Sequence, residues 1–545
     1  MSTLAAQFGP ALLVATLAAP LIVLAIFIAP GSRGLARAIV PLAAAPALFG
    51  AALAIGGAPF GADLPALRMS LSLDQSGGLL LLTAALLWLI VSVFALREGQ
   101  GEPNADRFAI SWLLTMTGSL GVFIAADLLT FYLVYALVSI PAYYLVSHEE
   151  DARSRRAGAV YLAFALLGEA VLLIAFVMLA AGEPSGSLLI RDVVAASPAS
   201  PWRDAALALV IIGFGMKIAL VPLHGWMPLT YTAAPISAAA VLSGAAVKAG
   251  VIGLIRFLPL ADAVPGWGEA LAWLGFISAF YGVAIGVTQR DPKTMLAYSS
   301  ISQMGVIAAA LGMALAGSRQ GAATEVAFYA ANHVLVKAAL FLTVGAVAAL
   351  DGRARTLALI VAALLGLNLA GLPLSGGSLA KLVVKDLFGV GPAGPVSQLS
   401  AAATTALMLV FIMRLARLPR EAGALSSARV TSWAALTIAA LLLPWLLFLA
   451  VGGPAEALAL DRLIDGIWPI LTGAALAAGL WAIEGQLPRI PAGDVIVAEE
   501  AAFRASTLLA DAFEQADRDM RQWPAAGLAL LTIVLALAAD GYASR

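Results

Sequence analysis

The chain has 545 residues, of which 62% are hydrophobic and 12% charged, and its formal net charge is -1 at pH 7. Soluble domains are about 45–50% apolar and about 25% charged, so this composition excludes an ordinary soluble protein. The near-zero net charge gives no basic surface for nucleic acid. The lack of cysteine excludes disulfides, thiol chemistry and cysteine-ligated iron–sulfur clusters in this chain.

Apolar runs close to 20 residues recur along the whole chain, and each is long enough to cross a hydrocarbon core about 30 Å thick. They predict an all-α polytopic membrane protein with sixteen spans. The first, preceded by no basic residue, is expected to be retained rather than cleaved as a signal peptide. The expected spans are 9–29, 37–56, 79–97, 108–125, 127–147, 157–181, 205–227, 234–256, 266–288, 295–317, 322–349, 355–389 (interrupted), 399–417, 430–451, 465–485 and 524–541.

Lysine and arginine are distributed unevenly among the loops between these spans. Loops 1, 3, 5, 9, 11 and 13 together hold fifteen of them, whereas the even-numbered loops 2 to 12 hold six. Because positive residues concentrate on the cytoplasmic side, the odd loops are expected to face the cytoplasm. We therefore predict a multi-pass protein of the bacterial inner membrane with its N-terminus on the outer, periplasmic side.

The segment between the last two expected spans carries both apolar and charged residues. Near 492–522 these alternate with helical spacing, which predicts a cytoplasmic amphipathic helix lying on the membrane or on a partner. The charge of this segment is mixed rather than basic, which slightly favours a partner surface over anionic lipid. A solvated linker helix is the alternative.

Ionisable residues within the spans give the strongest functional signal. The chain has six lysines, and four of them lie in spans 7 to 12: Lys217, Lys248, Lys337 and Lys381. A charge at mid-membrane costs at least about 2.5–3.5 kcal/mol, so it normally persists where it is paired, hydrated or used. One such lysine could snorkel to the surface or help helices to pack, but four at similar depth predict lateral proton movement.

Two histidines and a glutamate accompany the lysines. His333 precedes Lys337 by four residues and shares its helical face. His224 follows Lys217 in the same span, and Glu169 lies in the middle of span 6. Because each proton hop needs a donor and an acceptor within hydrogen-bond reach, directly or through water, we expect these side chains to assist the relay.

Two of the spans that carry a lysine contain helix-breaking residues. Broken helices at membrane depth line cavities and ion sites, and a pair of them in two halves of a chain indicates inverted repeats. The lysine precedes one break and follows the other, as an inverted pair requires, although glycine and proline are also common in membrane helices. The breaks comprise Pro222 and Pro228 after Lys217, and Gly371, Pro373 and Gly377 before Lys381.

Four motifs in a fixed order resemble those of a known family, the antiporter-like membrane subunits of respiratory complex I and of the multisubunit Mrp-type cation/proton antiporters. The resemblance covers about residues 70 to 420. GFGMKIALVPLHGWMP (213–228) and the following TAAPISAAAVLSGAAVKAGVIGLIRF resemble the family's seventh and eighth helices. The tenth, eleventh and interrupted twelfth helices are matched by DPKTMLAYSSISQMG (291–305), NHVLVKAALFLTVGA (332–346) and GLPLSGGSLAK (371–381).

The resemblance implies two inverted five-helix repeats in a fourteen-helix core, here with about two extra C-terminal spans. The corresponding divisions are 1–107 for spans 1–3, 108–256 and 257–420 for the two repeats, and 421–545 for the C-terminal spans and the amphipathic helix. It also implies transport of protons or sodium ions within a larger membrane complex, with other membrane subunits and the lipid bilayer as partners. No cofactor motif is present, so energy would come from a redox partner or a second ion gradient.

The resemblance also assigns roles to individual residues. Lys217 matches the lysine of the first half-channel, with His224 beside the break, and Lys248 matches the lysine that connects the two halves. The central relay on the eleventh helix corresponds to His333 and Lys337, and the second half-channel to Lys381.

Two acidic residues of the family pattern are missing. A fifth-helix glutamate usually lies five residues before a proline and pairs with the seventh-helix lysine, but the residue five before Pro141 is Ala136. The acidic residue that follows the HGW motif in the family is absent as well. Asp127 and Glu169 are the candidate replacements, and the mid-span depth of Glu169 favours it.

Two readings of function stay open. The first is a proton- or sodium-translocating subunit, which would be the non-redox membrane part of a complex I-like or hydrogenase-type oxidoreductase or of an antiporter. The second is a coupling or scaffold subunit with a degenerate first half-channel, for example the membrane partner in an ion-driven inorganic-carbon uptake system. An independent quinone-binding oxidoreductase is disfavoured because the sequence has neither cysteine nor a dinucleotide-binding glycine fingerprint.

Overall fold

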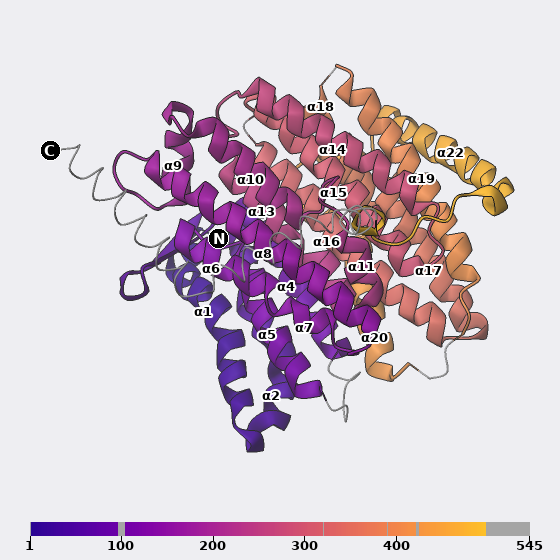
Figure 1. The fold of residues 1–545 in the computed structure, drawn as a ribbon, viewed down its shortest axis with the longest axis horizontal. Coiled ribbons are helices and arrows are strands. Elements are labelled where there is room, and N and C mark those ends of the chain that lie inside the picture. The colour runs from indigo at the N-terminus through magenta and orange to yellow at the C-terminus, as the bar shows by residue number, and fades with distance from the viewer. Residues whose placement is uncertain (1, 96–103, 320, 390, 421–424, 498–545) are drawn as a thin grey trace, which may run out of the picture. The chain divides into compact units, whose positions relative to one another are not determined.

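The computed structural model describes residues 2–95, 104–319, 321–389, 391–420 and 425–497 (Figure 1). Residues Met1–Gly493 form one compact unit. Most of the amphipathic helix expected near 492–522, and the whole of the span expected at 524–541, lie outside the described residues.

This unit consists almost entirely of helices. Its long helices are α1 (Ser2–Ile28), α4 (Gln75–Ala95), α5 (Ala105–Gly121), α8 (Ala152–Ala181), α10 (Arg203–Lys217), α14 (Pro265–Gly286), α15 (Pro292–Gly317), α16 (Ala322–Ala349), α17 (Gly352–Ala370), α19 (Ala393–Ala416), α20 (Ser427–Phe448) and α22 (Leu460–Ala482). The shorter ones are α2 (Arg33–Ile39), α3 (Ala45–Ile55), α6 (Leu128–Ser139), α7 (Ala142–Val146), α9 (Ile190–Ala196), α11 (Trp226–Ala233), α12 (Ile236–Val241), α13 (Lys248–Phe257), α18 (Gly376–Phe388) and α21 (Pro454–Ala457).

Thirteen helical stretches among the described residues are long and apolar enough to cross a membrane. Each of them corresponds to one of the predicted spans. Two more predicted spans are also helical: 108–125 corresponds to α5, which has 17 residues, and 205–227 is divided between α10 and α11. The chain is therefore a multi-pass α-helical membrane protein, as its composition predicted.

Two local features differ from the sequence-based expectation. The predicted span 127–147 is divided into α6 and α7 at Pro141, whose ring nitrogen has no hydrogen to donate to a continuous helix. Residues expected to form a loop after the second span instead form an antiparallel hairpin, in which β1 (Phe60–Leu64) pairs with β2 (Met69–Leu73). The alternation of apolar and polar residues in MSLSL is the signal that could have predicted this strand.

Glycines determine how closely α14 approaches α15. A Cβ atom at Gly275 would lie 2.5 Å from the backbone nitrogen of Ala309, and one at Gly312 would lie 2.4 Å from that of Ala272. Any larger residue would push the helices apart, as in the small-residue contacts of other membrane helices. The glycines recur every seven residues on both helices, at 268, 275 and 282 on α14 and at 305 and 312 on α15.

The helices differ in how much of their surface other helices cover. Of the most apolar 18 residues of each helix, 100% are buried in Ile236–Phe257 and 94% in α16. The corresponding shares are 33% in α8 and 17% in α22. Figure 1 shows α13, α15 and α16 in the middle of the drawing, with α1 and α22 toward its edges. Polar side chains on the central helices therefore face protein rather than lipid.

An ion pair joins Asp74, the residue before α4, to Arg256 of α13 at one end of this central group. Arg256 donates two hydrogen bonds to the carboxylate of Asp74, at 2.6 and 2.7 Å. Burial disfavours the charged form of Asp74, but the arginine outweighs this effect and holds the pKa of the carboxyl group below its usual value. The pair fixes the helix whose first residue is Lys248.

Candidate functional site

Six of the seven predicted relay residues occupy three places in the structure, and the seventh, His224, lies in the first helix break. Lys217 lies at the end of α10, close to Glu169 of α8. Lys248, His333 and Lys337 form a fully buried cluster between α13, α15 and α16. Lys381 lies separately, on α18 beside the second helix break.

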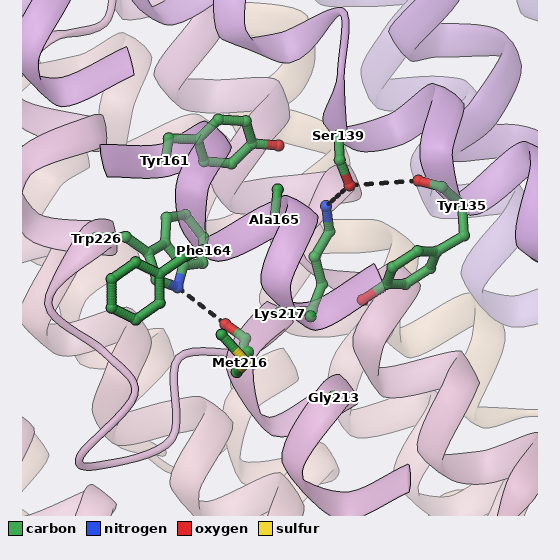
Figure 2. Close-up of a pocket in the computed structure, with 10 residues that line it drawn as sticks. Tyr135, Ser139, Tyr161, Phe164, Ala165, Gly213, Met216, Lys217 and Trp226 are labelled. Atoms are coloured by element: carbon green, nitrogen blue, oxygen red, sulfur yellow. Dashed lines mark hydrogen bonds between the residues drawn. The ribbon is translucent and has the colours of Figure 1, made fainter. Parts of the chain in front are cut away.

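Lys217 is the last residue of α10 and is 7% exposed. A cation at a helix C-terminus is favourable because the last carbonyl groups carry partial negative charge. Its amine donates a 2.7 Å hydrogen bond to the hydroxyl of Ser139, at the end of α6. Figure 2 shows this bond, with Tyr135 and Tyr161 on either side of the lysine side chain. The Nζ atom is 5.2 and 5.8 Å from the centres of these two rings.

Glu169 lies close enough to Lys217 for their charges to interact, and Ser139 lies next to both. No ion pair within 4 Å joins the two charged groups among the described residues, and none of those residues donates a hydrogen bond to Oε1 of Glu169. Ala136 is one helical turn before Ser139 on α6, so the two share a face. The Ser139 hydroxyl accepts the hydrogen bond from Lys217 and donates one of 3.3 Å to the backbone carbonyl of Tyr135.

A cavity of about 10 Å³ lies at this first site. Its lining includes Ser139, Tyr161, Gly168 and Lys217, and its volume is close to the minimum of about 10–15 Å³ that holds one water. The site can therefore hold at most a single bridging water in this arrangement.

Asp127, the other candidate acid, has a structural position. It caps the N-terminus of α6, where its carboxylate accepts hydrogen bonds from the backbone and hydroxyl of Thr130 and from the backbone of Ser70. The bonds to Thr130 stabilise the first turn of α6, and the bond to Ser70 attaches this turn to β2. The geometry thus leaves Glu169 as the acid beside Lys217.

Lys248 follows a π-helical turn, Leu242–Ala246, that separates α12 from α13. Such turns change the register of backbone hydrogen bonds and are frequent at functional sites. The amine of Lys248 donates to the carbonyl oxygen of Ser243 at 2.9 Å and lies 2.6 Å from Nδ1 of His333. Lys248 is thus bound on one side by its own helix and on the other by α16.

His333 and Lys337 lie on one face of α16, both with no exposed surface. The amine of Lys337 donates a 2.7 Å hydrogen bond to the carbonyl oxygen of Leu296 on α15. Lys337 lies close enough to His333 and Lys248 for charges on these groups to interact. The structure therefore brings together in space the three residues that the sequence placed on two different spans.

A polar network that the sequence analysis missed continues from this cluster. Tyr329, one turn before His333, donates to the side-chain oxygen of Gln303 at 2.8 Å, and the amide of Gln303 donates to Thr404 at 3.1 Å. These residues connect α16 through α15 to α19. The i, i+4 spacing of Tyr329 and His333 is the sequence signal that could have identified the network.

The first break separates α10 from α11. Pro222 lies in the non-helical segment between them, whereas Pro228 lies in the first turn of α11, where a helix does not need the missing N–H. His224 is fully buried in the same segment, with its ring 4.8 Å from that of Tyr281 and 6.4 Å from that of Tyr298. These contacts place His224 against α14 and α15.

The second break separates α17 from α18 and is braced by Asn368. The backbone of Gly371 adopts a positive φ of 96°, which favours glycine, and Pro373 follows in the turn. Gly377 donates from its backbone to the side-chain oxygen of Asn368 at 2.8 Å, and a Cβ atom there would lie 1.7 Å from the Asn368 carbonyl oxygen. The amine of Lys381 donates to the carbonyl of Ala370, the last residue of α17.

Comparisons with known proteins agree with this geometry. Residues 125–384 match the family model described as NADH:quinone oxidoreductase/Mrp antiporter, TM. The chain is 30% identical over 295 residues to Hydrogenase-4 component B of Escherichia coli, covering 51% of this chain and 43% of that protein. It is also 30% identical over 295 residues to NADH-quinone oxidoreductase subunit N of Desulforudis audaxviator, covering 52% and 57% respectively. The matches thus span about half the length of these curated relatives.

Two solved structures share the fold over nearly the whole chain. One is a chain of the Mrp complex from Dietzia sp. DQ12-45-1b, with a TM-score of 0.74 at 21% identity, covering 98% of this chain and 63% of that one. The other belongs to the membrane-bound sulfane sulfur reductase, an archaeal respiratory membrane complex, with a TM-score of 0.71 at 21% identity, covering 96% and 99%. At this identity the likeness concerns the fold.

Proposed function

We propose that this chain, whose residues 125–384 match the NADH:quinone oxidoreductase/Mrp antiporter transmembrane family, is a proton- or sodium-translocating subunit of a larger membrane complex. The observation that carries the proposal is the 2.6 Å contact between Lys248 and His333 in a fully buried cluster with Lys337. Ionisable groups at membrane depth are rare unless they form ion or proton pathways.

The contact between Lys248 and His333 suits proton transfer. When the lysine is charged, it donates to Nδ1 of the histidine, and the ring proton then resides on Nε2. Transfer of the lysine proton to Nδ1 gives an imidazolium, which can release the other proton from Nε2. Nε2 is buried and none of the described residues is its hydrogen-bond partner, so it is the nitrogen that is left to pass the proton on.

The neighbouring lysine couples the steps. Two cations in a low-dielectric interior repel each other more strongly than in water, so a proton on Lys337 opposes a proton on Lys248. Movement of charge at one site therefore favours its release at the next. Lys217 with Glu169 would operate in the first half, and Lys381 in the second, with His224 as an assisting group beside the first break.

The two helix breaks support a division into inverted repeats, with boundaries at 108–256 and 257–420. In each break an amine binds near a helix C-terminus: Lys217 ends α10, and Lys381 binds the last carbonyl of α17. The predicted orientation, with the N-terminus on the outer side of a bacterial inner membrane, belongs to the same proposal. The names of the relatives suggest redox subunits or further antiporter subunits as partners.

The test is proton or sodium flux in vesicles that contain the whole complex. Lys337→Ala is expected to abolish most of the flux, because removal of a positioned proton carrier typically costs about 10²–10⁴-fold. Thr343→Val is the matched control, since it alters a buried hydroxyl of the same helix without removing an ionisable group. Unchanged flux in Lys337→Ala, with normal assembly, would show that the relay proposal is wrong.

The first site favours a second candidate function, that of a coupling or scaffold subunit. Its lysine binds a neutral hydroxyl, and Ala136 stands where the family has its glutamate. Replacing Glu169 by Gln separates the two functions. Lost flux with normal assembly supports transport through a rewired first half, whereas unaffected function supports a scaffold, for example in ion-driven inorganic-carbon uptake.

A further inference from the structure

A cavity of about 320 Å³ lies beside the second break, where α18, α19 and α22 meet. Its volume is many times the about 10–15 Å³ that one water requires. Lys381 lines it, and so do Ser397 and Gln398 from the first turns of α19. The cavity is therefore large and polar enough to hydrate the amine of Lys381.

Charged side chains lead from this amine toward the surface. Lys385 follows Lys381 by one turn on the same face of α18 and also lines the cavity. Its amine lies 3.2 Å from the carboxylate of Asp465 on α22, and the two side chains are 39% and 55% exposed. A half-buried lysine is thus connected, through one cavity, to an exposed ion pair.

The acidic member of this pair comes from outside the part of the chain that the family model matches. That match ends at residue 384, whereas α22 begins at Leu460. Close contacts hold α22 in place: a Cβ at Gly473 would lie 2.4 Å from the Ala402 carbonyl oxygen, and one at Gly466 would lie 3.2 Å from the Pro373 ring. The helix therefore packs against both α19 and the second break.

We propose that α22 completes the second half of the relay. The cavity is the aqueous route between Lys381 and the membrane surface, and Asp465 is the carboxylate at its mouth that exchanges protons or sodium ions. This inference rests on the proposed function and adds a residue to it. A proton from the Lys381 ammonium passes through water to Asp465, which becomes neutral and releases Lys385; loss of that proton to bulk water restores the ion pair.

A lipid acyl chain is the competing occupant, because apolar residues also line the cavity, among them Leu382, Phe388 and Leu463. An acyl chain offers no hydrogen-bond partner to an ammonium, and a charge buried without one is costly. Water in the cavity could accept the hydrogens of the Lys381 amine that the Ala370 carbonyl does not bind, so the charged lining favours a hydrated route.

The first experiment measures water access and uses the fact that the chain contains no cysteine. Ser397→Cys and Ser400→Cys are made in the whole complex and treated with a charged, water-soluble methanethiosulfonate. Ser397 lines the cavity, whereas Ser400, three residues along α19, is 2% exposed and does not. We expect Ser397→Cys to be modified at least ten times faster and its flux to fall on modification.

Two outcomes of this labelling would overturn the proposal. One is equal rates for the two variants. The other is modification of Ser397→Cys by a lipid-soluble maleimide alone, which would show that an acyl chain fills the cavity. Because labelling does not depend on transport, it gives an answer even if the proposed function fails.

The second experiment measures flux in Asp465→Asn, with Asp461→Asn as the control one turn earlier on α22. Asp461 is 75% exposed and does not line the cavity. We expect at least a fivefold loss of flux in Asp465→Asn and none in the control. Full flux in Asp465→Asn, in preparations where Lys337→Ala is inactive, would overturn the role of Asp465 while leaving the proposed function intact.

Discussion

The site at Lys217 and the cluster around Lys248 bind their amines in different ways. Lys217 donates to a serine hydroxyl, with a carboxyl group nearby that forms no ion pair with it. Lys248 binds a histidine nitrogen, and Lys337 binds a backbone carbonyl. The first site thus combines one basic, one acidic and one hydroxyl side chain. The cluster combines three basic side chains, each of which becomes a cation when it binds a proton.

This difference indicates which site holds its charge more firmly. A nearby carboxylate stabilises the ammonium of Lys217, whereas none of the described acidic residues lies beside the buried cluster to stabilise two simultaneous cations. Protons in the cluster are therefore expected to be labile, and those at Lys217 to depend on the state of Glu169. Helices α10 and α13 approach closely at Gly250, where an added Cβ atom would lie 3.0 Å from the Cβ atom of Lys217. This close approach brings the two sites together.

The largest effect is expected in the cluster. His333→Ala and Lys248→Ala should each lower flux about 100-fold or more, because each removes one side of the 2.6 Å contact. If the two residues act as one unit, the double variant will be no slower than the slower single variant. The measurement is flux in vesicles with the whole complex, and additive losses would show that the contact is not a shared step.

A gain of function tests the first site. In a Glu169→Gln background, Ala136→Glu should restore flux by about tenfold, because a carboxylate placed one turn before Ser139 faces the same lysine. Ala136→Gln in that background is the matched control, since it adds similar volume without charge. Equal flux in the two variants would mean that the acid at this site has no role in transport.

The Ser139 hydroxyl that binds Lys217 should matter less. Ser139→Ala removes one hydrogen bond worth about 0.5–1.5 kcal/mol, so flux should fall roughly two- to tenfold. Ser139→Thr keeps the hydroxyl and should remain near wild type. A loss in Ser139→Ala as large as that in Lys217→Ala would indicate that the serine is itself a proton carrier.

The smallest effect on transport is expected from packing. Gly275→Val should lower the free energy of unfolding by about 1–3 kcal/mol, because the valine side chain would collide with the backbone of α15. The same helix supplies the Leu296 carbonyl that binds the amine of Lys337. Gly266→Val is the control on the same helix as Gly275, since nothing lies within 4 Å of a Cβ atom there. Thermal unfolding of the purified complex distinguishes them, and equal stability would contradict the close α14–α15 contact.

The sequence by itself determined the class of the protein and most of its relay. Apolar length identified the spans, and the cost of a buried charge singled out Lys217, Lys248, Lys337 and Lys381, because these signals are local and need no partner. The resemblance then ordered the motifs and exposed the missing acid at Ala136. The inverted repeats and the orientation remain predictions.

Only the tertiary structure decided how these residues are connected. It assigned Asp127 to a helix cap, bound Lys217 to Ser139, joined Lys248 to His333 across 85 positions of sequence, and brought Asp465 beside Lys385. Serines and exposed aspartates are common in any chain and give no local signal. Their roles arise from contacts between distant helices, which depend on how closely glycines let those helices approach and on where the breaks direct the chain.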